Sequence, residues 1–263
     1  MLSNSILEIV KPNLNNINSL NLQLCENESK AIKKIQSTTF KNCNSITELI
    51  FKSEKVIHWN VRTFFLKSNV ELIQSVNKLN NLKVLSLTNC GIDDISEKFN
   101  SNSPFSYLAN LTDLDLSSNK ITKVNKECFK GLFKLKFLNL SDNTINGSEE
   151  FPFDYLESLE SLNLSKNPII KIHRNLFGRK LKNLKELNIS NCSFNFIHYH
   201  SFRYLEKLHE IHLPVSFRNK TDRFDAYGLK KECIRHYDLH RFDIYEDEEY
   251  DDYRNIDEFD DMF

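Results

Sequence analysis

The chain contains 263 residues, 40% of them apolar and 27% charged, and carries a formal net charge of −1. This length and apolar content are enough for a sizeable core, and no run approaches the roughly 18 consecutive apolar residues that a membrane-spanning helix requires. The N-terminal sequence MLSNSILEIVKPN has neither the basic start nor the long apolar stretch of a secretory leader, so the sequence as written predicts no export signal.

We expect residues 1–16 to form an N-terminal cap. A series of related units follows this cap. Three irregular units begin with INSLNLQLC at Ile17, ITELIFKSEKVIHW at Ile46 and LKVLSLTNCGIDDI at Leu82. Four regular units, spaced by 24, 24 and 25 residues, are LTDLDLSSNKITKV from Leu111, LKFLNLSDNTI from Leu135, LESLNLSKNPIIKI from Leu159 and LKELNISNCSFNFI from Leu184. A last unit begins with LHEIHL at Leu208. Such self-similarity predicts a solenoid, here of about eight turns over residues 17–216.

Each unit begins with the pattern of a short strand. In LTDLDLSSN, Leu114 and Leu116 alternate with polar residues, as in a strand with one buried face. Asn119 follows where the chain must turn out of the strand, and its amide can bond to backbone groups that the turn leaves unpaired. Stacked turns therefore predict a ladder of side chains at this position, formed by Cys25, Cys90, Asn119, Asn143, Asn167 and Cys192.

A phenylalanine recurs 18 residues after the first leucine of each regular unit, so that successive turns can stack these rings in one column of Phe129, Phe153, Phe177 and Phe202. On this column and the repeated LxxLxLxxNxI pattern, the chain resembles the typical 24-residue, phenylalanine-spine class of leucine-rich repeat proteins, common in animal extracellular and cell-surface proteins. The resemblance implies an α/β solenoid, a right-handed horseshoe with a parallel sheet on its concave side and an irregular convex side.

In extracellular members of this class, cysteines cluster at the ends of the repeat domain. The six cysteines of this chain are not clustered in that way. Three of them fall on the ladder in nonadjacent turns, which disfavours disulfides among them. Cys43 matches the buried position of Leu132, so that only Cys128 and Cys233 remain. The cysteine pattern therefore departs from that of extracellular relatives.

Residues 217–242 are expected to form a C-terminal capping helix, because Leu229, Cys233 and Tyr237 are four residues apart. The same helix would place Cys233, His236 and His240 on one face, which leaves a zinc-dependent enzyme as a remote alternative. No fourth ligand occurs at a fixed spacing, so we expect no metal and no cofactor.

An acidic tail ends the chain. Residues 243–263 carry 11 acidic side chains and one arginine, which leaves 34 basic and 25 acidic residues in the remainder. Two interpretations stay open. The tail is a solvated disordered segment, or it is an interaction arm that contacts a basic surface, either on the body of this chain or on a partner.

The side chains that alternate with the buried leucines would project from the concave sheet, where repeat proteins usually bind their partners. We expect the ligand-binding residues to be Asp113, Asp115, Phe137, Asn139, Ser161, Asn163, Glu186 and Asn188. Phe137 with Asp113 and Asp115 is the least generic cluster among them. The alternative is that Phe137 only shields its neighbours.

The sequence favours binding over catalysis, since it contains no GxSxG, phosphate-loop or HExxH motif. The expected partner is a protein, not a nucleic acid or a membrane. Sequons at Asn27, Asn146 and Asn219 are the plausible glycan carriers. The resemblance favours an extracellular or cell-surface location, whereas the absent leader and unpaired cysteines favour an intracellular scaffold or adaptor.

Overall fold

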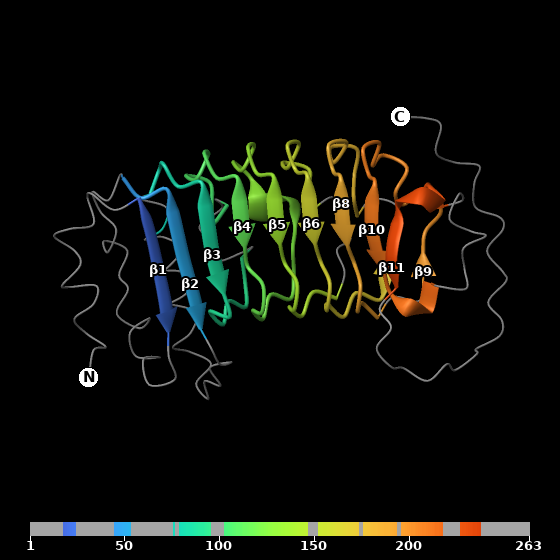
Figure 1. The fold of residues 1–263 in the computed structure, drawn as a ribbon, viewed down its shortest axis with the longest axis horizontal. Coiled ribbons are helices and arrows are strands. Elements are labelled where there is room, and N and C mark those ends of the chain that lie inside the picture. Colours follow the sequence, from blue (N-terminus) through green and yellow to red (C-terminus); the bar gives the residue numbers. More distant parts are fainter. Residues whose placement is uncertain are drawn as a thin grey trace.

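A computed structural model describes residues 18–24, 45–53, 76, 79–95, 103–146, 152–173, 176–193, 196–217 and 227–237. Within these ranges one parallel sheet runs the length of the molecule, with its strands side by side in chain order (Figure 1). Its strands are β1 (Ser19–Leu24), β2 (Glu48–Ser53), β3 (Val84–Thr88), β4 (Asp113–Asp115), β5 (Phe137–Asn139), β6 (Ser161–Asn163), β8 (Glu186–Asn188), β10 (Glu210–Leu213) and β11 (Ile234–Tyr237).

The predicted parallel-sheet solenoid is confirmed, and a strand begins in each of the eight predicted units. The number of turns, about five, differs slightly from the eight expected, and the overall fold is the same. The opposite side of the solenoid is irregular in the described residues. It contains the 3-10 helices η3 (Lys126–Phe129) and η4 (Val215–Phe217) and a small parallel sheet of β7 (Lys171–Ile172) and β9 (Phe196–Ile197).

Leucines and the phenylalanine spine fill the space between the two sides. Leu114 of β4 is buried while the flanking aspartates are partly exposed, which is the alternation expected of a strand with one face on the core. Phe129 and Phe153 stack with ring centroids 6.1 Å apart, and Phe177 and Phe202 stack at 5.3 Å. Stacking of equivalent rings makes each turn depend on its neighbours, as in other solenoids.

A left-handed residue follows each of the main-sheet strands β3, β4, β5, β6 and β8 within three residues. This residue stands just before the ladder position, with φ between 51° and 57°, and is Asn89, Ser118, Asp142, Lys166 or Asn191. The left-handed conformation turns the chain sharply after the strand. It brings the following ladder side chain back under the strand.

The predicted capping helix is wrong where the structure describes that segment. Residues 227–237 form the 3-10 helix η6 (Lys231–Cys233) and then β11, which pairs in parallel with β10. The Phe202 N–H donates to the Tyr227 carbonyl over 3.0 Å, and the Cys233 thiol donates to the Leu208 carbonyl over 3.0 Å. Tyr227 and Cys233 thus take the spine and first-leucine positions of a further turn.

Several sequence-based expectations fall on residues outside the described ranges. These are the N-terminal cap at residues 1–16, the ladder position Cys25, the core position Cys43, the sequons at Asn27 and Asn219, and the acidic tail at 243–263.

Candidate concave-face binding site

The register of the sheet places the predicted ligand-binding residues in two adjacent columns. One column runs from Asp113 through Phe137, Ser161 and Glu186 to Glu210. The other runs from Asp115 through Asn139, Asn163 and Asn188 to His212. The structure therefore brings all eight predicted residues onto one face, because equal repeat lengths align equivalent positions of successive strands.

Carboxylates dominate the charge of this face. Between β2 and β10 the two columns hold Glu48, Asp113, Asp115, Glu186 and Glu210, and in these described strands they hold no lysine or arginine. We refer to these five carboxylates as the acidic strip. It stands out against a chain whose residues 1–242 contain more basic than acidic side chains.

Phe137 is the large apolar side chain of the strip, and 47% of it is exposed. It lies beside Asp113 on one side and Ser161 on the other, both short side chains that leave its ring open. An exposed aromatic ring among small polar neighbours can act as an anchor for a partner.

Part of the second column serves the fold. The side-chain oxygens of Asp115, Asn139, Asn163 and Asn188 each accept a hydrogen bond from the backbone N–H two residues later, at 2.9 to 3.1 Å. These bonds close the turn that follows each strand. At this column, therefore, one oxygen of each side chain already accepts a hydrogen bond from the fold itself.

Two further contacts lie on or beside the strip. Glu210 Oε1 and His212 Nε2 are 2.8 Å apart at the β10 end. At the strand entrances, Glu160 bridges Lys185 and Lys136, at 2.5 Å and 3.1 Å. The Lys185 and Lys136 ammonium groups hold the pKa of Glu160 below its ordinary value. This Lys–Glu–Lys row ties together three consecutive turns beside the strip.

The ladder residues lie inside the solenoid and not on the binding face. The Asn143 amide accepts from the Ile121 N–H at 3.0 Å and donates to the Leu116 and Leu140 carbonyls at 3.0 Å. Asn119 and Asn167 make the same pattern of bonds to their own and the preceding turn. These amides satisfy backbone groups that would otherwise be buried without partners.

Thiols take the ladder position at two described turns. The Cys90 thiol donates to the Thr88 carbonyl at 3.6 Å, and the Cys192 thiol to the Leu164 carbonyl at 3.3 Å. Burial raises the pKa of Cys90 to about 12 and that of Cys192 to about 11. Cys90, Cys128, Cys192 and Cys233 are all free and buried, which makes them poor nucleophiles in the folded chain.

The spacing assumed for a zinc site is wrong. Cys233 lies in η6 and His236 lies in β11, so the helix that would have aligned them with His240 does not form there, and His240 lies outside the described ranges. Among the residues that the structure describes, no three His, Cys, Asp or Glu side chains group as metal ligands would. In the same residues no helix is long and apolar enough to cross a membrane.

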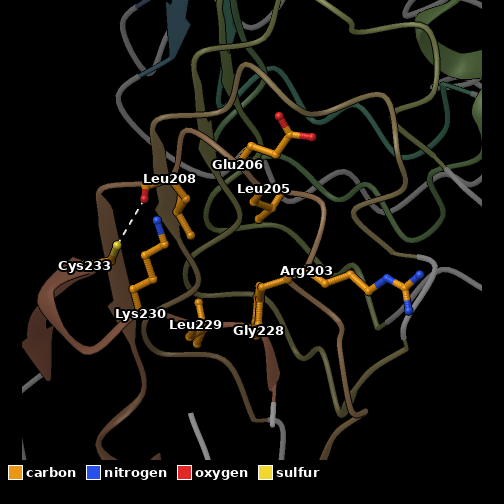
Figure 2. Close-up of a pocket in the computed structure, with 9 residues that line it drawn as sticks. Arg203, Leu205, Glu206, Leu208, Gly228, Leu229, Lys230 and Cys233 are labelled. Carbon is orange, nitrogen blue, oxygen red and sulfur yellow. Dashed lines mark hydrogen bonds between the residues drawn. The ribbon is translucent and has the colours of Figure 1, made fainter. Parts of the chain in front are cut away.

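A second surface, which was not predicted from the sequence, lies at the C-terminal end of the irregular side. The guanidinium carbons of Arg179 and Arg203 lie 5.1 Å and 4.6 Å from the centroid of the Tyr204 ring. Arg203 also lines a cavity of about 290 Å³, together with Lys230 and the leucines of the last two turns (Figure 2). No sequence motif marks this arrangement.

Comparison with known proteins agrees with this architecture. A leucine-rich repeat profile matches residues 80–145, 109–169 and 157–214, and a BspA-type leucine-rich repeat profile matches residues 2–103. No curated protein matches the chain.

Two solved structures are similar to it at low sequence identity. One belongs to the Toll–Spatzle complex of Drosophila, with a TM-score of 0.55 and 21% identity, and covers 68% of this chain and 21% of its own. The other is internalin C2 of Listeria monocytogenes, with a TM-score of 0.51 and 22% identity, covering 77% and 83%. The chain thus spans only about a fifth of the first structure, and the likeness concerns the fold. Because the first profile covers more than half of its residues, the chain belongs to the leucine-rich repeat family.

Proposed function

We propose that this chain is a non-enzymatic protein-binding module that takes its ligand on the concave face around Phe137. The observation that carries the proposal is the half-exposed Phe137 ring within the acidic strip. The Toll–Spatzle structure is itself a complex between proteins, which is consistent with a protein ligand.

The chemistry of the strip defines the ligand. Five carboxylates in two columns that hold no lysine or arginine in the described strands favour a cationic segment, since complementary charge speeds association and rejects acidic partners. Phe137 offers an apolar contact near Asp113 and Asp115, so the ligand should place an aliphatic or aromatic side chain between its basic residues.

A matched pair of phenylalanine variants tests the site. Phe137→Ala removes the proposed anchor, whereas Phe133→Ala removes a ring that is 58% exposed but lies in the turn before β5. A protein captured from native tissue by the immobilised chain should bind Phe137→Ala at least about tenfold more weakly, a loss of about 1.4 kcal/mol. Its affinity for Phe133→Ala should be unchanged.

The charges of the strip give a second arm to this experiment. The double variant Asp113→Asn with Asp115→Asn should capture the protein more weakly than the unmodified chain does. In the unmodified chain, 0.5 M salt should also weaken capture. If the captured protein binds both Phe variants equally well and ignores salt, the concave site is the wrong surface.

The resemblance to extracellular repeat proteins supports our proposal that this module belongs to an extracellular or cell-surface protein. An intracellular scaffold or adaptor is the competing assignment, and it is favoured by the four free cysteines of the described residues. Expression through a secretory pathway separates the two. A glycan at the exposed Asn146, or at Asn27 or Asn219, supports the first assignment. An unexported, unglycosylated chain with six titratable thiols supports the second.

A further inference from the structure

Two like-charged side chains converge on one aromatic ring at the C-terminal end of the solenoid. Arg179 and Arg203 come from consecutive turns, and both guanidinium groups contact Tyr204. Both arginines are exposed, and neither forms an ion pair with a carboxylate of the described residues. We call these three residues the Tyr204 ledge. The ring holds the two cations in place through cation–π contacts, while their repulsion remains for an anion to relieve.

The neighbouring cavity adds a mixed polar and apolar surface to the ledge. Leu205, Leu208 and Leu229 line it together with Lys230, and Arg203 belongs to both the ledge and the cavity. Figure 2 shows Arg203 extending away from the leucines, with Lys230 on the other side near Cys233. Glu206 is the acidic residue of the lining. The combined surface therefore suits a segment that alternates carboxylates with apolar or aromatic side chains.

The chain carries such a segment at its own C-terminus. Residues 243–263 read DIYEDEEYDDYRNIDEFDDMF, with 11 acids and with aromatic residues among them. β11 begins directly after Cys233, which lines the cavity, and ends at Tyr237. Its four residues span about 13 Å at roughly 3.3 Å each. The six steps from residue 237 to residue 243 reach up to about 20 Å, which is enough to return the acidic segment to the cavity.

We infer that residues 243–263 bind to the Tyr204 ledge and the adjoining cavity of the same chain. Carboxylates pair with Arg179, Arg203 and Lys230, and aromatic side chains rest on the leucines. The tether gives the segment an effective concentration in the millimolar range for a short linker, so a weak contact is sufficient. The acidic strip repels the same segment, so the concave face stays open to a cationic ligand.

Crosslinking in the full chain tests this inference without any ligand. Tyr250 is replaced by the photoreactive amino acid p-benzoylphenylalanine, and the crosslinked peptides are identified by mass spectrometry. We expect the crosslinks within residues 203–208 and 228–233 of the same molecule. Arg179→Glu with Arg203→Glu should reduce their yield at least about tenfold, and 0.5 M salt should reduce it in the unmodified chain.

Lys120→Glu with Lys123→Glu is the matched control, because it makes the same change of charge at two exposed lysines near η3. The control should leave the crosslink yield unchanged. Three results would overturn the inference: crosslinks to the concave face, crosslinks between two copies that increase with protein concentration, or a yield that responds equally to both double variants. If the crosslinking experiment fails, the Phe137 proposal still stands, since the capture experiment tests a different surface.

Discussion

At the scale of single residues, this solenoid depends on side chains that replace missing backbone partners. Asn119, Asn143 and Asn167 each donate to three carbonyls of their own and the preceding turn, and each accepts from at least one N–H of the preceding turn. A thiol at Cys90 or Cys192 supplies a single weak donor at the same position.

Asn143→Ala should be among the most destabilising polar substitutions in the chain. It leaves the Ile121 N–H without its amide acceptor and removes a donor from the Leu116 and Leu140 carbonyls, all inside the core. Asn119 and Asn167 still donate to those two carbonyls, so the Ile121 N–H is the group left unsatisfied, and the loss should be about 1 to 3 kcal/mol. Urea unfolding measures it. Lys120→Ala, at an exposed position of the same region, should change stability by less than about 0.5 kcal/mol, and a loss this small for Asn143→Ala would refute the ladder's role.

The buried thiols predict a loss of stability at alkaline pH. Burial raises the pKa of Cys90 to about 12 from an ordinary 9.0. Above pH 9 the unfolded chain releases this proton while the folded chain keeps it, so the free energy of unfolding falls as pH rises from about 9 to about 12. Cys90→Ala should flatten this fall by roughly 2 to 3 kcal/mol at pH 11. Urea unfolding at pH 7, 9 and 11 tests it, and parallel curves for the two proteins would contradict it.

At the scale of elements, the sequence predicted the strands better than the end of the solenoid. The regular spacing of 24 and 25 residues defines both the strands and their register, which is why Asp113 and Phe137 were placed side by side correctly. The last turn escaped because Cys233 replaces its first leucine and Tyr227 replaces its spine phenylalanine. The pairing of β10 with β11 also contains a register shift, which obscures the alternation of inward-facing and outward-facing residues. Leu229 and Cys233, both buried, fitted a helix equally well by spacing alone.

Gly228→Ala tests whether this last turn is an integral part of the solenoid. Gly228 has φ +79°, and an added Cβ would lie 2.8 Å from the Arg203 N and 2.9 Å from its Cα. The backbone of the last turn must move away from the preceding turn, at a cost of at least about 1 to 2 kcal/mol for the left-handed conformation alone. Hydrogen exchange should therefore accelerate in η6 and β11 and stay unchanged in β4 to β6.

Gly131→Ala serves as the comparison for that experiment. Its added Cβ would lie 2.9 Å from the Ser106 carbonyl oxygen, in a central turn. Here the accelerated exchange should centre on β4 and β5. Identical exchange profiles for the two variants would mean that the last turn is not coupled to Arg203 as the structure has it.

At the scale of the whole molecule, the chain separates its charges onto different surfaces. The acidic strip follows from the repeat, since each carboxylate stands at a fixed position of its unit, and it could be located from the sequence once the register was known. The Tyr204 ledge could not be located from the sequence. It depends on one extra residue in the turn at Gly178 and on side-chain directions that place Arg179 and Arg203 on one ring. The repeat predicts which side chains align in columns on successive strands. An extra residue in a turn between strands creates contacts that only the folded backbone defines.

A stack of turns with contacts only between neighbours should lose stability locally when one turn is weakened. Phe153 is buried and stacks on Phe129 at 6.1 Å, so Phe153→Ala removes a core ring and its contact with the preceding turn. The cost should be about 3 to 5 kcal/mol. In a solenoid this loss should appear most strongly in the exchange of β5 and β6 and decline toward β3 and β11. Hydrogen exchange measured by mass spectrometry resolves this gradient. An equal loss of protection in every strand would show that the chain unfolds as one cooperative unit, and that the stacked phenylalanines couple all turns.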